Sequence, residues 1–307
     1  MTDTNPGMSI IIVTHNRKQM LRNLLSSVRD SSGGIVGQII IVDDSDREDG
    51  QCRKDFPDLP IDYVHFSKRI FISKAKNIAL SMSTGEFSYF IDDDNVVTGN
   101  TLQIPYDTIR NDPQIGAVMP AVLYRDDPEL VWVYATPFRR GQWGFQLVGR
   151  NLPRDPKKEN TLLDTDALPN ASIVRTAAAI EIGGFDESLE VNSSAFFCYR
   201  LKMAGWKAVA NTGSFTFHDV ELPGSFGYWT QHQLADPERV MRETREWFGI
   251  MSRVHPGMKN FRVHAMAHFP RVALPNTAAY LARGGKERTR LLFCQLRGMM
   301  DGLYRSV

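Results

Sequence analysis

Short apolar segments that end in acidic residues constrain the fold of this 307-residue chain more than any other feature. Residues 9–13 (SIIIV) and 38–42 (QIIIV) are runs of mainly β-branched residues, and 87–91 (FSYFI) is a similar run with aromatic residues. Uninterrupted apolar runs of this length are typical of strands that are buried on both faces of a parallel sheet. The last two runs continue directly into clusters of aspartates. We therefore predict buried strands whose carboxyl ends carry several carboxylates.

Helical periodicity alternates with these strands. Apolar residues at helical spacing over 20–28 and 73–82 predict helices, and further strands are predicted at 63–66 and 115–119. This alternation implies an open α/β sheet, in which ligands usually lie beyond the carboxyl ends of the strands. Downstream we expect an irregular region at 124–158 and helices at 176–182, 196–204, 238–251 and 289–303.

The clustered carboxylates favour a bound cation. Asp43 and Asp44 follow one predicted strand, and Asp92, Asp93 and Asp94 follow another. Adjacent carboxylates repel one another unless a cation or hydrogen-bond donors compensate them, so a hard divalent ion is a natural partner. In an extended strand end, residues i and i+2 point the same way, which places Asp92 and Asp94 on one side. The alternative is a solvated acidic turn.

Two common phosphate-binding motifs are absent from the sequence. It contains neither the Gly-x-x-x-x-Gly-Lys-Ser/Thr loop of nucleotide hydrolases nor a Gly-x-Gly-x-x-Gly motif after the first predicted strand. We therefore expect a diphosphate, if one binds, to be held through a metal ion and basic side chains.

An ordered series of motifs resembles the family 2 nucleotide-sugar glycosyltransferases. The motifs are IIIVTHNR at 10–17, IIIVDDS at 39–45, KAKN at 74–77, GEFSYFIDDD at 85–94, IGGFDE at 182–187, Arg200-Leu201 before Ala204-Gly205-Trp206, and His218. The resemblance covers roughly residues 8–220. It implies an α/β protein with the GT-A fold, a Rossmann-like open mixed sheet flanked by helices, with a helical C-terminal extension. The tail motifs at 253–256 (RVHP) and 297–302 (RGMMDG) resemble bacterial and archaeal members, of the rhamnosyl- or galactofuranosyl-type, more weakly.

The resemblance also implies a domain organisation. Residues 1–230 would form the glycosyltransferase domain, with a nucleotide-binding half at about 8–100 and an acceptor half at about 101–230. Residues 231–307 would form a helical, basic extension.

Donor-binding roles follow from the resemblance, position by position. Thr14, His15 and Asn16 would lie at the base and ribose, and Asp44 would bind the base. Lys76 stands where the family usually has Arg, in contact with the base or the diphosphate. The implied donor-binding set is Thr14, His15, Asn16, Asp44, Lys76, Asp92 and Asp93. Simpler readings are a helix N-cap turn for residues 14–16 and a solvated helix residue for Lys76.

The resemblance implies a divalent metal as cofactor. Asp94 would be the principal ligand, Asp92 would approach the ribose and the metal, and His218 would complete the ligand set. Mg²⁺ and Mn²⁺ prefer carboxylate and phosphate oxygens, and one imidazole suits Mn²⁺. The alternative for His218 is a loop histidine with ordinary hydrogen bonds.

The chain departs from the family at the position of the catalytic base. The family usually has a Glu-Asp pair before the Arg-Leu helix, and counting back from Arg200 those positions are Ser193 and Ser194. Serine cannot accept the acceptor's proton at neutral pH, and loss of a general base costs about 10²–10⁴ in rate. One explanation is that a nearby carboxylate replaces it, the candidates being Glu190, Asp186 and Asp219. The others are an acceptor that is already ionised, such as a lipid phosphate, and a protein with little transferase activity.

The leading functional hypothesis is a metal-dependent, inverting hexosyl- or deoxyhexosyltransferase. It would move a sugar from a UDP, GDP or dTDP sugar to a carbohydrate or polyprenyl-linked acceptor, in keeping with a role in cell-envelope polysaccharide synthesis. The alternative is a catalytically impaired, sugar-nucleotide-binding subunit, which the two serines favour. A nucleotidyltransferase ranks last, because the first strand is not followed by a Gly-rich basic loop.

Basic residues are concentrated near the C-terminus. The whole chain has 36 Lys and Arg against 35 Asp and Glu, a net charge of +1 that argues against a nucleic-acid partner. Residues 253–307 alone have a net charge of about +8, which suggests an anionic surface as partner. We expect this segment to hold the protein peripherally on the inner face of a membrane. A solvated basic surface or a homo-oligomer contact is the alternative.

The location expected from the sequence is cytoplasmic. The chain has three widely spaced cysteines, which give no disulfide framework. The N-terminal residues do not resemble a signal peptide, and no apolar stretch has the length of a membrane span.

Overall fold

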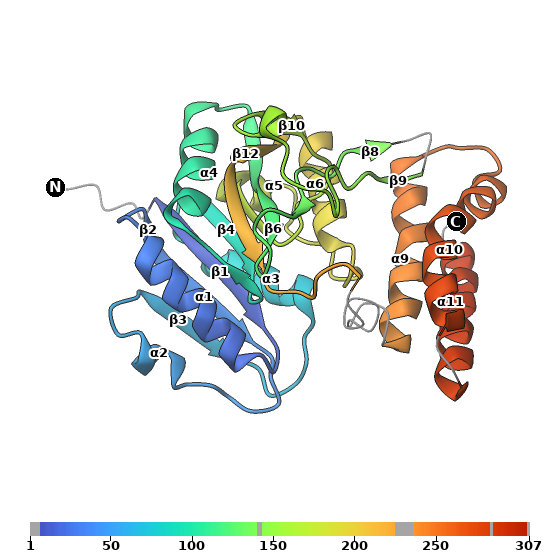
Figure 1. The fold of residues 1–307 in the computed structure, drawn as a ribbon, viewed down its shortest axis with the longest axis horizontal. Coiled ribbons are helices and arrows are strands. Elements are labelled where there is room, and N and C mark those ends of the chain that lie inside the picture. Colours follow the sequence, from blue (N-terminus) through green and yellow to red (C-terminus); the bar gives the residue numbers. More distant parts are fainter. Residues whose placement is uncertain (1–6, 140–142, 225–235, 283–284, 306–307) are drawn as a thin grey trace. The chain divides into compact units, whose positions relative to one another are not determined.

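The structure is a computed structural model that describes residues 7–139, 143–224, 236–282 and 285–305. Its internal contacts divide the chain into two compact units (Figure 1). Unit 1 consists of the chain up to Pro137, Gln146–Ser188 and Ser194–Val220. Unit 2 consists of Phe138–Phe145, Leu189–Ser193 and the chain from Glu221 onward. The boundary predicted at residue 230 falls in 225–235, outside the described residues.

Unit 1 contains a ten-stranded mixed sheet (Figure 1). The strand order along its main path is β10-β12-β6-β11-β4-β1-β2-β3, with β5 paired to β12 and β7 paired to β6. The strands are β1 (Met8–Thr14), β2 (Val36–Asp43), β3 (Ile61–His65), β4 (Phe87–Asp92), β5 (Asn95–Val96), β6 (Ile115–Tyr124), β7 (Val131–Val133), β10 (Leu162–Asp164), β11 (Ala171–Arg175) and β12 (Lys207–His218).

Strand direction brings the acidic clusters to one edge of the sheet. β1 is parallel to both β2 and β4, and β3 is parallel to β2. β11 is antiparallel to β4 and to β6, so β6 runs in the same direction as β4, and β12 is parallel to β6. The carboxyl ends of β1, β2, β4, β6 and β12 therefore lie at the same edge.

Helices cover both faces of the sheet because alternate strand residues point to opposite sides. Ile10 and Ile12 of β1 pack in one cluster with α1 and α4, and Ile11 packs in another with α3, α5 and α6. Leu21, Leu24, Leu25 and Val28 of α1 are buried at the predicted helical spacing. The helices of this unit are α1 (Lys18–Ser31), α2 (Cys52–Asp55), α3 (Ile72–Met82), α4 (Gly99–Asn111), α5 (Thr176–Glu181), α6 (Ser193–Met203), which begins at the last residue of a unit 2 segment, and a 3-10 helix at Pro156–Lys158.

Residues 124–158 are more regular than we predicted. β7 lies inside this range, and β8 (Phe138–Arg139) pairs with β9 (Gly144–Phe145) in a separate two-stranded sheet. The prediction of an irregular region was wrong here because strands of two or three residues are too short to show a period in the sequence.

Unit 2 is mainly helical. Its long helices are α9 (Pro237–Val254), α10 (Phe261–Ala282) and α11 (Gly285–Arg305). A proline begins α9, and the preceding Asp236 accepts a hydrogen bond from the backbone N–H of Glu238 as an N-cap. The carboxylate of Glu246 on α9 accepts backbone N–H bonds from Glu190, Val191 and Asn192 at 2.8–3.0 Å, which fixes the segment 189–193 within this unit. Among the described residues, no helix combines the length and apolarity that crossing a membrane requires.

Candidate functional site

A buried carboxylate links the ends of the first two strands. His15 Nδ1 lies 3.0 Å from Asp44 Oδ1 and 2.9 Å from the Asp44 carbonyl oxygen. Asn16 has φ 57°, a left-handed conformation that Asn tolerates, and its N–H donates to Ser45 Oγ at 2.7 Å. The helix that follows takes Arg17 as its N-cap residue, without a side-chain cap bond. Residues 14–16 therefore serve to connect the strand ends and do not cap α1.

Asp44 also fixes the segment that leads into α3. Its Oδ2 atom accepts backbone N–H bonds from Ile70 at 2.8 Å and Phe71 at 3.1 Å. Phe71 has φ 62°, an uncommon backbone conformation for a residue with a bulky side chain. One carboxylate thus connects β1, β2 and the start of the helix that carries Lys76.

The three aspartates at the end of β4 have partners that differ in part. Asp92 Oδ1 lies 3.5 Å from Lys76 Nζ. Asp93 is buried and accepts from Thr14 Oγ1 at 2.7 Å and Arg17 Nη1 at 2.9 Å. Arg17 Nη1 also donates to Asp94 Oδ2 at 3.0 Å. β4 ends at Asp92, so strand alternation does not extend to Asp94, and the geometric argument that put these two on one side does not apply.

The pKa values of Asp93 and Asp94 are shifted in opposite directions. Burial raises the pKa of Asp93 to about 6, although Arg17 opposes this rise. Burial also opposes ionisation of Asp94, but the His218 imidazole and the Arg17 guanidinium outweigh it and hold the Asp94 pKa below its ordinary value. Asp94 is therefore the aspartate of this pair that keeps its charge when the pH falls below 6.

His218, the last residue of β12, lies next to Asp94. Its Nε2 atom lies 3.5 Å from Asp94 Oδ1, and its ring meets the edge of the Trp132 ring with 5.1 Å between centroids. The imidazole is buried, and within the described part of the chain its Nδ1 atom has no hydrogen-bonding partner. Asp219 follows, and its backbone N–H donates to the Asp94 carbonyl oxygen at 2.8 Å.

Asp94 and His218 fit an incomplete metal site. A carboxylate and an imidazole with an unsatisfied nitrogen form a donor set that suits Mn²⁺. In the described residues, no group of three or more His, Cys, Asp or Glu side chains could hold an ion. A metal ion here would therefore need further ligands from a bound molecule, and oxygens of a diphosphate are of the right kind.

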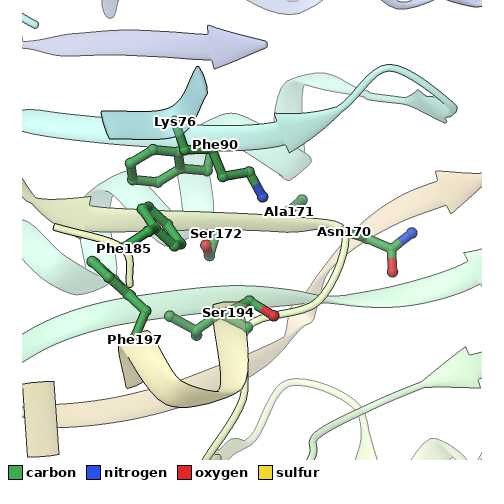
Figure 2. Close-up of a pocket in the computed structure, with 9 residues that line it drawn as sticks. Lys76, Phe90, Asn170, Ala171, Ser172, Phe185, Ser194 and Phe197 are labelled. Carbon is green, nitrogen blue, oxygen red and sulfur yellow. The ribbon is translucent and has the colours of Figure 1, made fainter. Parts of the chain in front are cut away.

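A small pocket of about 10 Å³ includes Lys76, the residue that contacts Asp92 (Figure 2). Lys76 of α3 and Ser194 of α6 both line it, together with Asn170 and Ser172 beside or on β11. The Lys76 side chain is only 8% exposed, and its ammonium lies 5.5 Å from the centre of the Phe185 ring. Lys76 is therefore buried, and the alternative that it is a solvated helix residue is wrong. Ser194, at the usual position of the base, does face a pocket shared with a buried cation.

The three carboxylates considered as substitute bases lie in different surroundings. Asp186 accepts hydrogen bonds from the backbone and hydroxyl of Ser188. Glu190 belongs to unit 2 and forms an ion pair with Arg242 at 2.9 Å. Asp219 forms an ion pair with Arg125 and is directly bonded to the backbone of Asp94. Asp219 is thus hydrogen-bonded, through its backbone N–H, to the aspartate cluster.

The sequence analysis gave no role to Arg17 or Asn95. Arg17 contacts two aspartates more than 70 residues away, and Asn95 Nδ2 donates to Asp94 Oδ1 at 3.1 Å. The signal that could have indicated Arg17 is a basic residue shortly after strand β1, whose parallel neighbour β4 leads into three consecutive aspartates. Nothing comparable marks Asn95.

Comparison with known proteins gives a family and a fold. A family model described as glycosyl transferase family 2 matches residues 9–173. No curated protein matches the sequence.

Two solved structures share the fold. A mannosyltransferase from Pyrobaculum calidifontis, PcManGT, in complex with GDP-Man and Mn²⁺, has 17% identity and a TM-score of 0.56, over 98% of this chain and 87% of its own. GalNAc-T7 with UDP, GalNAc and Mn²⁺ has 14% identity and a TM-score of 0.58, over 88% of this chain. This chain spans 54% of the length of GalNAc-T7. The predicted fold class, an open mixed α/β sheet of the GT-A type flanked by helices, is confirmed.

Proposed function

Because the chain belongs to glycosyl transferase family 2, we propose that it transfers a sugar from a nucleoside diphosphate sugar with the help of a divalent metal. The observation that carries this proposal is the pairing of Asp94 and His218 at the carboxyl edge of the sheet, where Lys76 also contacts Asp92. The two related structures were determined with UDP or GDP-Man and with Mn²⁺, which supports the same ligand classes here. The donor is a UDP, GDP or dTDP sugar.

Asp94 and His218 would hold the metal, with Asp92 at its side. An ion bound there would offset the negative charge that develops on the departing diphosphate. The imidazole favours Mn²⁺ over Mg²⁺, since Mg²⁺ prefers an all-oxygen environment. Arg17 keeps the Asp93 and Asp94 carboxylates in place, and the inward position of Asp93 suits a supporting role better than donor contact.

Thermal unfolding with nucleotides tests this proposal. A ligand that binds only the folded protein raises the melting temperature by an amount that grows with the ratio of its concentration to Kd. We expect one of UDP, GDP and dTDP to raise it in the presence of Mn²⁺ and not in the presence of EDTA. If none of the three changes the melting temperature, the proposed donor site is wrong.

Lys76 is proposed to contact the donor diphosphate. Replacing it with Met keeps most of its volume and removes the charge, so we expect donor Kd to rise by about 10- to 100-fold, the value of a charge-assisted hydrogen bond. Lys74→Met is the matched control, because Lys74 is exposed on the same helix. Titration calorimetry with the nucleotide identified above measures both. Equal affinities for the two variants would exclude Lys76 from the site.

For the reaction we propose inversion at the anomeric carbon, with Asp219 as the base that deprotonates the acceptor. Its bond to the Asp94 backbone supports this choice over Asp186 and Glu190. The acceptor is a carbohydrate or a polyprenyl-linked molecule. We further propose that the transferred sugar is a hexose or deoxyhexose and that the protein resembles the rhamnosyl- or galactofuranosyl-type members. Its place would be in cell-envelope synthesis, at the inner face of a membrane.

One observation favours a second candidate function. Ser193 begins α6 and Ser194 lines the pocket, so the usual base position is filled by a hydroxyl. A sugar-nucleotide-binding subunit without transferase activity would have this arrangement. Donor binding without sugar transfer or donor hydrolysis would identify it.

A further inference from the structure

Helix α11 packs on α9 through small residues. Gly298 and Gly302 are buried on the side that faces α9, one turn apart. A Cβ atom on Gly298 would come within 2.4 Å of the Met241 carbonyl oxygen, and one on Gly302 within 2.9 Å of Phe248 Cβ. The two helices therefore approach so closely that this contact leaves no room for large side chains.

The opposite side of α11 carries the large apolar residues. Phe293, Leu296, Met300 and Tyr304 are between 59% and 84% exposed. Their spacing of three, four and four residues places them in one stripe along the helix. A surface helix of a globular protein normally turns such a stripe to the core. Here the stripe is on the outside, which marks a surface that contacts something else.

Helix α10 of the same unit also exposes large apolar side chains. Val263, Leu274 and Leu281 are between 54% and 69% exposed, and their spacings of 11 and 7 residues place them on one side of the helix. The exposed side chains of this helix also include Arg262 and Arg271, and its sequence contains no acidic residue.

Arginines border the stripe of α11. Arg290 and Arg297 are exposed and lie seven residues apart, so both lie along the same edge of the stripe. Asp301 is the acidic residue of this helix whose side chain the structure describes, and it is half-buried. Each of the two helices thus carries exposed large apolar side chains together with exposed arginines.

We propose that this α10–α11 surface binds an anionic lipid membrane, with both helices lying in the plane of the headgroups. Apolar stripes bordered by Arg are characteristic of helices that lie in a membrane interface, and an exposed Tyr at the end of α11 suits the headgroup level. In the described residues no helix could cross a membrane, so contact in the plane is the geometry available.

Charge decides between a membrane and a second copy of the chain. Two identical copies meeting through these helices would bring arginines of one copy towards arginines of the other, which costs free energy. Anionic headgroups instead complement the arginines, and the acyl-chain boundary accepts the apolar stripe. The observations therefore favour lipid.

Co-sedimentation of the full chain with vesicles tests the proposal. One vesicle type contains phosphatidylcholine alone, and the other contains phosphatidylcholine with phosphatidylglycerol. We expect binding to the anionic vesicles and little binding to the neutral ones. The double variant Leu296→Ser/Met300→Ser should bind the anionic vesicles at least about tenfold more weakly, given the apolar area removed.

A matched control separates the stripe from general hydrophobicity. The double variant Ile180→Ser/Met203→Ser removes apolar side chains of similar exposure, 57% and 68%, from helices of unit 1 and should bind like the unmodified chain. Because all four positions are exposed, circular dichroism should show folded protein for both variants. Arg290→Gln/Arg297→Gln should lose binding to anionic vesicles in the same assay.

Three results would overturn the proposal. The first is no sedimentation of the unmodified chain with anionic vesicles. The second is equal loss of binding in the stripe variant and its control. The third is a dimer in analytical ultracentrifugation that the stripe substitutions convert to a monomer, without any vesicle binding, which would assign the surface to a second copy. The assay needs no donor or metal, so its failure would leave the proposed transfer reaction standing, and the reverse also holds.

Discussion

Replacement of Asp94 by Asn is expected to lower kcat/KM for sugar transfer by about 10³-fold or more. The substitution preserves the size of the side chain but removes the charge that would hold the metal opposite His218. The stabilisation at stake is several kcal/mol, and each 1.36 kcal/mol is a factor of ten in rate. Steady-state kinetics with the donor identified by thermal unfolding would measure the loss. The Mn²⁺-dependent rise in melting temperature should disappear in the same variant.

The fold should survive this substitution, because Arg17 keeps its bond to Asp93 when Asp94 is neutral. Asp58→Asn, at an exposed position away from the site, is the matched control and should retain full activity. An Asp94→Asn enzyme with more than about a tenth of the original kcat/KM would show that Asp94 is not the principal metal ligand.

Replacement of Asp219 by Asn should reduce kcat by about 10²–10⁴ while donor affinity stays the same. The reason is that Asn cannot take the proton of the acceptor hydroxyl, whereas the backbone bond from residue 219 to Asp94 does not depend on the side chain. Rates across a pH series, together with calorimetric Kd values for the donor, separate a base from a residue that only positions the site. Loss of the base should flatten the acid limb of the profile.

Asp186→Asn is the appropriate comparison, because the Asp186 carboxylate accepts hydrogen bonds from Ser188. We expect it to be close to fully active. Should Asp219→Asn also be fully active, the acceptor would have to arrive already ionised, as a lipid phosphate does. That result would replace the proposed base without affecting the donor site.

The parts of the fold that could be predicted are those in which local sequence and burial agree. The apolar runs at 9–13 and 38–42 became the buried cores of β1 and β2, each longer by a few residues at its ends. The leucines of α1 face the sheet as their spacing required. In these elements the residues that are buried are also the residues that look apolar in the sequence.

β12 was not predicted because several of the residues that it buries are polar. Burial alternates along its whole length, yet Thr212, Ser214 and Thr216 occupy buried positions. Each hydroxyl finds a carbonyl partner far away in the sequence, such as Asn100 for Ser214 at 3.0 Å and Val96 for Thr216 at 3.3 Å. A single sequence gives no sign of such distant partners, so the strand reads as a polar loop.

Prolines misled the sequence analysis in two places. The strand predicted at 115–119 stops before Pro120, but β6 continues through this proline to Tyr124. The missing N–H is tolerated because the register of β12 shifts opposite this point, between Asn211 and Phe215. α4 was also missed: it contains Pro105, and Thr98 and Thr101 cap its start in a reciprocal pair of bonds.

The site, like the fold, could be predicted only in part. The carboxyl ends of parallel strands could be predicted to share an edge, which is why the two aspartate clusters were singled out together. The sequence could not show that Asp92 faces Lys76 while Asp94 faces Arg17 and His218, because those contacts depend on the turn after β4.

The bonds from Ile70 and Phe71 to Asp44 have a consequence for the kinetics of binding. The segment before α3 is held by the chain itself, so a nucleotide would meet preorganised walls and would spend little of its affinity on ordering them. Association would then approach a simple one-step encounter, with specificity expressed mainly in how long the complex persists. A substitution at Asp44 would convert this rigid recognition into one that must order the segment each time, and it would slow association as well as weaken binding.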